Sequence, residues 1–285
     1  MEDVAAAAGV DKATVSRALK GDPRISSSTR EKVWIAAREL GYGVDFAARG
    51  LSGGRTSLAA VVLEDTFPWF SPALFEGMNR VLSREGMDIL LKMPGSSPGK
   101  TAKTLASHRV ECVAWLGKGG PEFQQVLPNI PVPMVTAGFS VHPFPAVLLS
   151  EQGTMDRIAS ISGGCPLRLL TFEKMLFPFL SRHIEPFHPL PEGAFFTVAD
   201  GLPGTTGAMA GRGCAACMPG QVPPVGWHCL EWPAFEMGVT MARIMLNALR
   251  GQGPCPQETL LVPVLRNPAG EPLPHVKEKN QPKFI

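Results

Sequence analysis

Basic and polar side chains gather near the start of the chain, in a pattern suited to binding a polyanion. Lys12, Ala13, Ser16 and Arg17 share the outward side of one short predicted helix, whose other side is apolar. An ammonium group can donate to the O6 and N7 atoms of guanine, and guanidinium and hydroxyl groups can donate to phosphate oxygens. Residues 1–57 hold nine Lys and Arg against seven Asp and Glu, so the chain's whole net charge of +2 lies there.

Three short helices are predicted to position these side chains. Apolar residues recur at helical spacing before and after Gly9 and again before Gly21, and both glycines are typical stop signals. Ser26 is a good N-cap for a third helix, Ser27 to Leu40, because its hydroxyl can accept from a free backbone N–H. Three helices within residues 2–41, the first two joined by a short turn with glycine, predict a helix-turn-helix domain.

The remaining chain is predicted to alternate strands and helices. Residues 58–63 form a continuous apolar run typical of a buried parallel strand, and residues 72–86 repeat apolar side chains at helical spacing. Strand–helix–strand units of this kind predict parallel sheets. The other expected strands are 88–93, 110–116, 132–137, 157–161, 194–198 and 260–265, and the other expected helices are 167–180 and 233–250.

Composition excludes several classes of protein. A chain of 285 residues that is 45% hydrophobic and 18% charged can pack a core, so it is neither disordered nor a coiled coil. The longest stretch without a charged residue, 123–150, contains five prolines, so we expect no membrane span and no membrane partner. The acidic start, Met1-Glu2-Asp3, lacks the basic and apolar pattern of a secretory signal, so we expect a cytoplasmic protein.

The cysteines and histidines do not form a convincing metal site. Cysteines at 112, 165, 214, 217, 229 and 255 are expected to be buried free thiols. Cys214 and Cys217 form one CxxC pair near His228 and Cys229, but no second pair lies at zinc-finger spacing, so we expect no metal and no cofactor. The sequence shows no nucleophile elbow, phosphate-binding loop or paired carboxylates, so we do not expect an enzyme.

Five short strings occur in register in the N-terminal segment: Asp3-Val4-Ala5, Ala8-Gly9-Val10, Thr14-Val15-Ser16-Arg17, Ser26 with Thr29-Arg30, and Leu40-Gly41-Tyr42. With these strings, the segment closely resembles the headpiece and hinge of the LacI/GalR family of bacterial transcription regulators. The resemblance implies an α+β fold overall: a three-helix helix-turn-helix headpiece (1–44), a hinge helix and linker (45–57), and a two-lobed α/β core with parallel sheets, like a periplasmic binding protein (58–285). The implied N-lobe is 58–149 and 233–255, and the implied C-lobe is 150–232 and 256–275.

The resemblance implies that the second helix enters the major groove of double-stranded operator DNA. Lys12 and Ala13 then take the positions that choose bases. In the hinge, Leu51 is implied to wedge into a central minor-groove step, with Ala48 packed beside it. The hinge departs from the family pattern at Val44, Asp45 and Gly50. The implied DNA-binding residues are Lys12, Ala13, Thr14, Ser16, Arg17, Lys20, Arg24, Ser26, Thr29, Ala48 and Leu51.

The core resembles the family's core more weakly, and two segments look lost. A family helix is expected after Thr154, but the predicted strand 157–161 follows at once, and a crossing segment after His228 looks nearly absent. Because a lost helix leaves a sheet face uncovered, we expect a weakened homodimer.

The resemblance also implies a cleft for a small-molecule effector between the two lobes. The matching residues are Trp69, Phe70, Gln152, Arg168, Ala199 and His228. Ala199 and His228 offer few hydrogen-bond acceptors for the hydroxyls of a sugar, whereas Arg168 and the aromatic rings suit a flat or anionic molecule. A sugar, another ligand or partner, and a cleft without a specific ligand all stay open.

The sequence therefore predicts a sequence-specific DNA-binding transcriptional regulator, a repressor that acts as a dimer on a palindromic operator. The alternative is a small-molecule-binding or structural protein of the same fold that has lost operator binding. The headpiece pattern favours the first interpretation, because a chain that had abandoned DNA should have lost that pattern before the pattern of its core.

Overall fold

The chain divides into two units, Met1–Thr56 and Ser57–Ile285. A computed structural model describes residues 1–19, 22, 24–40, 56–64, 68, 71–94, 98–171, 177, 179–184, 196–200 and 213–274. Residues 45–55 of the implied hinge helix and linker lie outside these residues.

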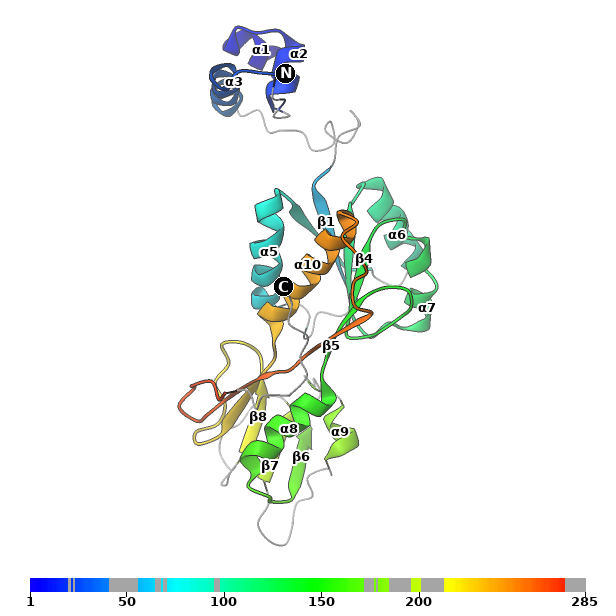
Figure 1. Ribbon diagram of the computed structural model, residues 1–285, viewed down its shortest axis with the longest axis vertical. Helices are drawn as coiled ribbons and strands as arrows, with labels where there is room; N and C mark the ends of the chain where they lie inside the picture. Colours follow the sequence, from blue (N-terminus) through cyan, green and yellow to red (C-terminus); the bar gives the residue numbers. More distant parts are fainter. Residues whose placement is uncertain are drawn as a thin grey trace. The chain divides into compact units, whose positions relative to one another are not determined.

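The first unit contains the three predicted helices, α1 (Glu2–Ala8), α2 (Lys12–Leu19) and α3 (Ser27–Glu39) (Figure 1). Helix α1 ends at Gly9, whose φ of 65° is a left-handed conformation that glycine tolerates. Apolar side chains from all three helices form one small core: Val4, Ala5, Val15, Ala18, Leu19, Val33, Ala36 and Ala37. This core holds α2 against its neighbours and confirms the predicted helix-turn-helix domain.

The first sheet of the second unit is parallel throughout. Its strand order is β10-β5-β4-β3-β1-β2, and every neighbouring pair is parallel. The strands are β1 (Leu58–Leu63), β2 (Asp88–Lys92), β3 (Cys112–Leu116), β4 (Met134–Ala137), β5 (Ala146–Leu149) and β10 (Glu258–Leu261). The strands predicted at 58–63, 88–93, 110–116 and 132–137 are thereby confirmed.

Helices cover both faces of this sheet (Figure 1). The helices α5 (Pro72–Leu82) and α10 (Ala234–Leu249) pack on one face, in the same apolar cluster as the Val61 and Leu63 side chains of β1. Val62 of β1 points to the other face, which α6 (Pro98–Ser107) covers with α7 (Pro121–Gln124) and the 3-10 turn η2 (Leu127–Asn129). A second 3-10 turn, η1 (Ser83–Glu85), extends α5. Burial on both faces explains why β1 is a continuous apolar run.

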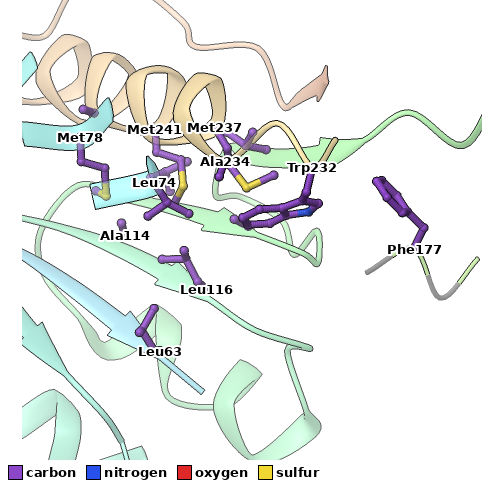
Figure 2. Packing of buried hydrophobic residues seen from close by; sticks show 14 of the residues in the cluster. Leu63, Leu74, Met78, Ala114, Leu116, Phe177, Trp232, Ala234, Met237 and Met241 are labelled. Atoms are coloured by element: carbon purple, nitrogen blue, oxygen red, sulfur yellow. The ribbon is translucent and has the colours of Figure 1, made fainter. Parts of the chain in front are cut away.

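Helices α5 and α10 cross with their backbones in contact. A β-carbon added at Gly238 lies 2.1 Å from the carbonyl oxygen of Leu74, and one added at Gly77 lies 2.2 Å from that of Phe235. Neither position has room for a side chain unless the helices separate. Figure 2 shows the side chains around the crossing: Leu74, Met78, Met237 and Met241 from the helices, and Leu63, Ala114 and Leu116 from the sheet.

The second sheet has the order β11-β9-β8-β7-β6, in which only the β11–β9 pair is antiparallel. Its strands are β6 (Leu167–Thr171), β7 (Phe196–Asp200), β8 (Gly213–Cys217), β9 (His228–Glu231) and β11 (Val264–Arg266). Helices α8 (Glu151–Ser162) and α9 (Leu180–His183) contribute Ile158 and Leu180 to the cluster on one face. The other face carries a separate cluster of Ala199, Ala215, Cys217, Trp227 and Cys229.

Three predictions for the second lobe are wrong. Residues 157–161 are helical and belong to α8, because the Ser150 hydroxyl accepts from the Gly153 N–H and starts a helix there. Residues 167–171, expected to begin a helix, form the parallel strand β6. The expected strand 260–265 is two strands in different sheets, interrupted at Pro263, so the first lobe extends to Leu261 instead of ending at residue 255.

The helix that looked lost is present. Helix α8 directly follows Ser150, and the strand β9, beginning at His228, leads through Trp232 and Pro233 into α10. The expected reason for a weakened dimer, a missing helix after Thr154, is therefore removed. The predicted helix 233–250 is confirmed as α10, and the predicted strand 194–198 lies two residues later, as β7. No helix among the described residues has the length and apolar character needed to cross a membrane.

Candidate nucleic-acid interface

Asp11 caps the first turn of α2. Its carboxylate accepts from the backbone N–H of Thr14 at 2.8 Å and from the Thr14 hydroxyl at 2.7 Å. The hydroxyl and amide hydrogen bonds hold the pKa of the Asp11 carboxyl below its ordinary value. The cap fixes the end of the helix at which Lys12 and Ala13 lie. Sequence reasoning missed Asp11, although an aspartate directly before a predicted helix is a recognisable N-cap signal.

The residues predicted to face outward from α2 do so. Lys12, Ala13 and Arg17 are exposed and Ser16 is half-buried, whereas Val15 is fully buried in the headpiece core. The helix therefore presents its N-terminal end and one polar side to solvent. That is the form in which the second helix of a helix-turn-helix domain enters a major groove, with its N-terminal residues at the base edges.

Lys12 has an acidic partner that sequence reasoning did not foresee. Its ammonium donates to Oε1 of Glu2, in the first turn of α1, at 2.7 Å, and the two side chains are 61% and 81% exposed. The hydrogen bond and the charge of Lys12 lower the pKa of the Glu2 carboxyl. Ten residues separate the partners, so only the packing of α1 against α2 brings them together.

Arg24, in the turn between α2 and α3, also has a carboxylate partner in the described structure. Its guanidinium donates to both carboxylate oxygens of Asp22, through Nε at 3.0 Å and Nη2 at 2.7 Å. These bonds lower the pKa of Asp22 to about 2. A phosphate contact by Arg24 must therefore compete with Asp22 for the same donors.

The start of α3 is held by the predicted cap. The Ser26 hydroxyl oxygen accepts from the Thr29 N–H at 3.1 Å, and the hydroxyl donates to the Thr29 side chain at 2.8 Å. Arg30 ties the preceding turn to the helix, because its Nη2 donates to the carbonyl oxygens of Asp22 and Ile25. Ser26 and Thr29 thus lie at a well-ordered helix start. Of the remaining predicted DNA contacts, three lie outside the described residues: Lys20, Ala48 and Leu51.

The described structure places two of the predicted effector residues, Ala199 and His228, on opposite faces of the second sheet. Arg168 is half-buried on β6, and its Nη1 donates to the carbonyl oxygen of Leu167. Ala199 on β7 is fully buried in the cluster with Cys229. His228 precedes Cys229 on β9, so its side chain points to the opposite face of the sheet from Ala199.

Two predicted effector residues, Gln152 and His228, have local surroundings that the structure describes. Gln152 lies exposed in the first turn of α8 and donates from Nε2 to Asp156 at 2.8 Å. Partial burial of His228 lowers the pKa of its imidazole, so the neutral ring is favoured near pH 7. Trp69 and Phe70 lie outside the described residues.

The six cysteines are free thiols, four of them buried. Cys217 and Cys229 share one face of the second sheet, and the hydrogen bond between their thiols raises the pKa of Cys217. Cys214 belongs to the opposite face, where burial raises the pKa of its thiol. The described residues contain no group of three His, Cys, Asp or Glu side chains arranged to hold a metal ion.

Residues 1–44 match the family model described as bacterial regulatory proteins, lacI family. Catabolite control protein A of Priestia megaterium is 30% identical over 166 residues, which are 56% of this chain and 50% of the relative. The HTH-type transcriptional regulator CelR of Thermobifida fusca is 33% identical over 172 residues, 58% of this chain and 49% of the relative. The chain thus spans about half the length of the curated relatives it matches.

Solved structures resemble the chain over nearly its whole length. The Lac repressor dimer bound to operator and the anti-inducer ONPF has a TM-score of 0.67 and 18% identity, covering 93% of this chain and 96% of that one. A LacI-family transcriptional regulator from Silicibacter pomeroyi has a TM-score of 0.65 and 19% identity, covering 93% of this chain and 97% of that one. At these identities the likeness establishes a fold: a helix-turn-helix headpiece with a core like a periplasmic binding protein.

Proposed function

Because residues 1–44 match the model of the lacI family of bacterial regulatory proteins and the core has the fold of solved LacI-family regulators, we propose that the chain is a transcriptional repressor that binds operator DNA. The observation that carries the proposal is the exposed N-terminal end of α2, where Lys12, Ala13 and Arg17 face solvent and Asp11 fixes the first turn. A helix held in this way can enter the major groove as a rigid body.

The polar residues of the headpiece divide into two roles. Lys12 and Ala13, at the tip of α2, read base edges, since an ammonium suits guanine acceptors and a methyl group suits the thymine methyl. Arg17, with Ser26 and Thr29 at the start of α3, contacts phosphates and sets the register of the headpiece on the duplex.

The operator is a palindrome bound by a dimer. One headpiece of about forty residues buries too little surface for tight and specific binding, and two headpieces related by a two-fold axis fit an inverted repeat. Residues 45–57 act as the hinge, with Leu51 as the minor-groove wedge beside Ala48. The core, residues 58–285, supplies the dimer contacts and the effector site.

The effector is a flat or anionic molecule and not a neutral sugar. Ala199 is fully buried and its side chain cannot accept a hydrogen bond from a sugar hydroxyl, and Gln152 is a neutral amide in place of a carboxylate. Arg168 supplies the positive charge of such a site. CelR, whose solved complex contains cellobiose, has a TM-score of 0.52 to this chain. A screen for the effector must therefore include sugars beside flat and anionic molecules.

A gel-shift titration with DNA from upstream of the chain's own gene tests the proposal. We expect a discrete complex that outcompetes unrelated DNA. Arg17→Ala should weaken binding to both DNAs and reduce the slope of log K against log salt by about one, because one phosphate contact is lost. Equal binding to both DNAs by the wild type supports the alternative, a protein of this fold that has lost operator binding.

A further inference from the structure

Glu2 and Lys12 form an exposed acid–base pair at the end of α2 that the proposed function directs at DNA. The Lys12 ammonium lies 2.7 Å from Glu2 Oε1, and both side chains are mostly in solvent. Exposed ion pairs add little to the stability of a fold. The pair's importance therefore lies in where it places a carboxylate: beside the cation proposed to choose a base.

The other acidic side chains around α2 have different tasks. The Asp11 carboxylate accepts two hydrogen bonds from Thr14 and is committed to capping the helix. The Asp22 carboxylate is bound on both oxygens by Arg24. The Glu2 carboxylate, in contrast, accepts a hydrogen bond from Lys12, the cation at the tip of α2.

The edge of a G·C pair complements such a donor–acceptor pair. In the major groove, guanine presents two adjacent acceptors, N7 and O6, and cytosine presents the N4 amino donor beside them. An ammonium can donate to guanine while the neighbouring carboxylate accepts from cytosine. An A·T pair instead places the N6 donor between two acceptors, so the ammonium meets one acceptor and then a like donor.

We propose that Glu2 is a specificity-determining residue of the DNA interface, which with Lys12 reads one G·C pair in each half-site: Lys12 donates to guanine and Glu2 accepts from cytosine. The inference rests on the proposed function. The Glu2 carboxylate also repels phosphates and competes for the Lys12 ammonium, so it weakens binding to DNA that lacks this base pair.

In vitro selection from random DNA, followed by affinity measurements at several salt concentrations, tests the inference. The protein carries its tag at the C-terminus, away from Glu2. Selection with the wild type gives the motif, and selection with Lys12→Met shows which base pair Lys12 reads. That pair should be G·C, and an A·T pair there overturns the inference.

Glu2→Gln keeps the shape of the side chain and removes its charge. We expect the preference for G·C over A·T at that position to fall about tenfold. Binding to unrelated DNA should rise severalfold, with a salt slope steeper by about one, because the Glu2 carboxylate no longer competes with phosphates for Lys12. In the Lys12→Met background, Glu2→Gln should change the preference by much less.

Asp3→Asn is the matched control, because Asp3 is also exposed in the first turn of α1. It removes the same charge one residue away, so it should raise binding to unrelated DNA but leave the base preference unchanged. Equal loss of preference in both variants shows a general charge effect and overturns the inference. Far-UV circular dichroism confirms that each variant keeps its helices.

The failures of the two proposals are distinguishable. A wild type that enriches no motif rejects the DNA-binding function, and this inference with it. A wild type that enriches a motif, together with a Glu2→Gln variant of unchanged preference, rejects only the role of Glu2.

Discussion

Gly238→Ala should destabilise the core by forcing apart the helices α5 and α10. The added β-carbon lies 2.1 Å from the carbonyl oxygen of Leu74 and 2.9 Å from the amide nitrogen of Met78. Both are backbone atoms inside a helix, so no side-chain rotation relieves the contact. An ordinary separation is at least 3.4 Å, so the helix axes must part by roughly 1 Å near the crossing.

Two opposing effects set the magnitude. Overpacking a well-filled core costs about 1–3 kcal/mol and more where backbone must move, while replacing glycine by alanine inside a helix returns up to about 1 kcal/mol. We expect a net loss of about 2 kcal/mol, which lowers the melting temperature of a domain of this size by roughly 4–8 °C. Thermal unfolding of the full chain, followed by the fluorescence of the buried Trp115 and Trp232, measures it.

Gly99→Ala is the matched control in α6. A β-carbon there meets nothing within 4 Å, so the variant should be neutral or more stable by about 0.5 kcal/mol. Gly153→Ala should fall between the two, because its nearest neighbour is the movable side chain of Val262. A Gly238→Ala protein that melts at or above the wild-type temperature refutes the close packing of α5 on α10.

Three further predictions concern the headpiece and the effector site. Asp11→Ala should lower the midpoint of chemical denaturation of the headpiece, because it removes the cap of α2, whereas Glu31→Ala, which removes an exposed carboxylate from α3, should change it much less; equal effects contradict the cap. Since Arg24 lowers the pKa of Asp22 to about 2, below its ordinary value, the ionised form stabilises the folded headpiece above about pH 4, and that contribution is lost as the pH falls toward 2. Asp22→Asn should therefore flatten the pH dependence of headpiece melting between pH 4 and 2, and an unchanged profile argues against the pair. In a thermal-shift screen, a flat or anionic ligand at a hundredfold excess over its Kd should stabilise the core by about 2.7 kcal/mol, whereas a large shift with a neutral monosaccharide, lost in Arg168→Ala, contradicts the proposed ligand class.

The headpiece was predictable because its signals are local. Gly9 ends α1 and Ser26 caps α3, and each acts on residues within one turn of itself. The exposed side of α2 followed from the spacing of its apolar residues. The acidic partner of Lys12 on that helix could not be predicted from spacing. Glu2 reaches Lys12 only because α1 and α2 pack together, and no short sequence pattern encodes that contact.

The second lobe was misread where short apolar runs fit two structures. Residues 157–161 contain two isoleucines three apart, which suit a strand or a helix equally, and the Ser150 cap decides for α8. Residues 167–171 become a strand because β7 pairs with them along their length, an interaction between distant segments. Side chains alternate between the two faces of a strand, so Ala199 and His228 lie on opposite faces of the sheet. Matching these residues to family positions along the sequence could not reveal this.

The most direct test of the central claim is the affinity of the protein for its selected DNA motif, measured against unrelated DNA at physiological salt. The account predicts an inverted-repeat motif, a specific complex at least about a thousandfold tighter than the complex with unrelated DNA, and two protein chains per site. Binding that does not distinguish the two DNAs, or a motif without two-fold symmetry bound by a single chain, contradicts it.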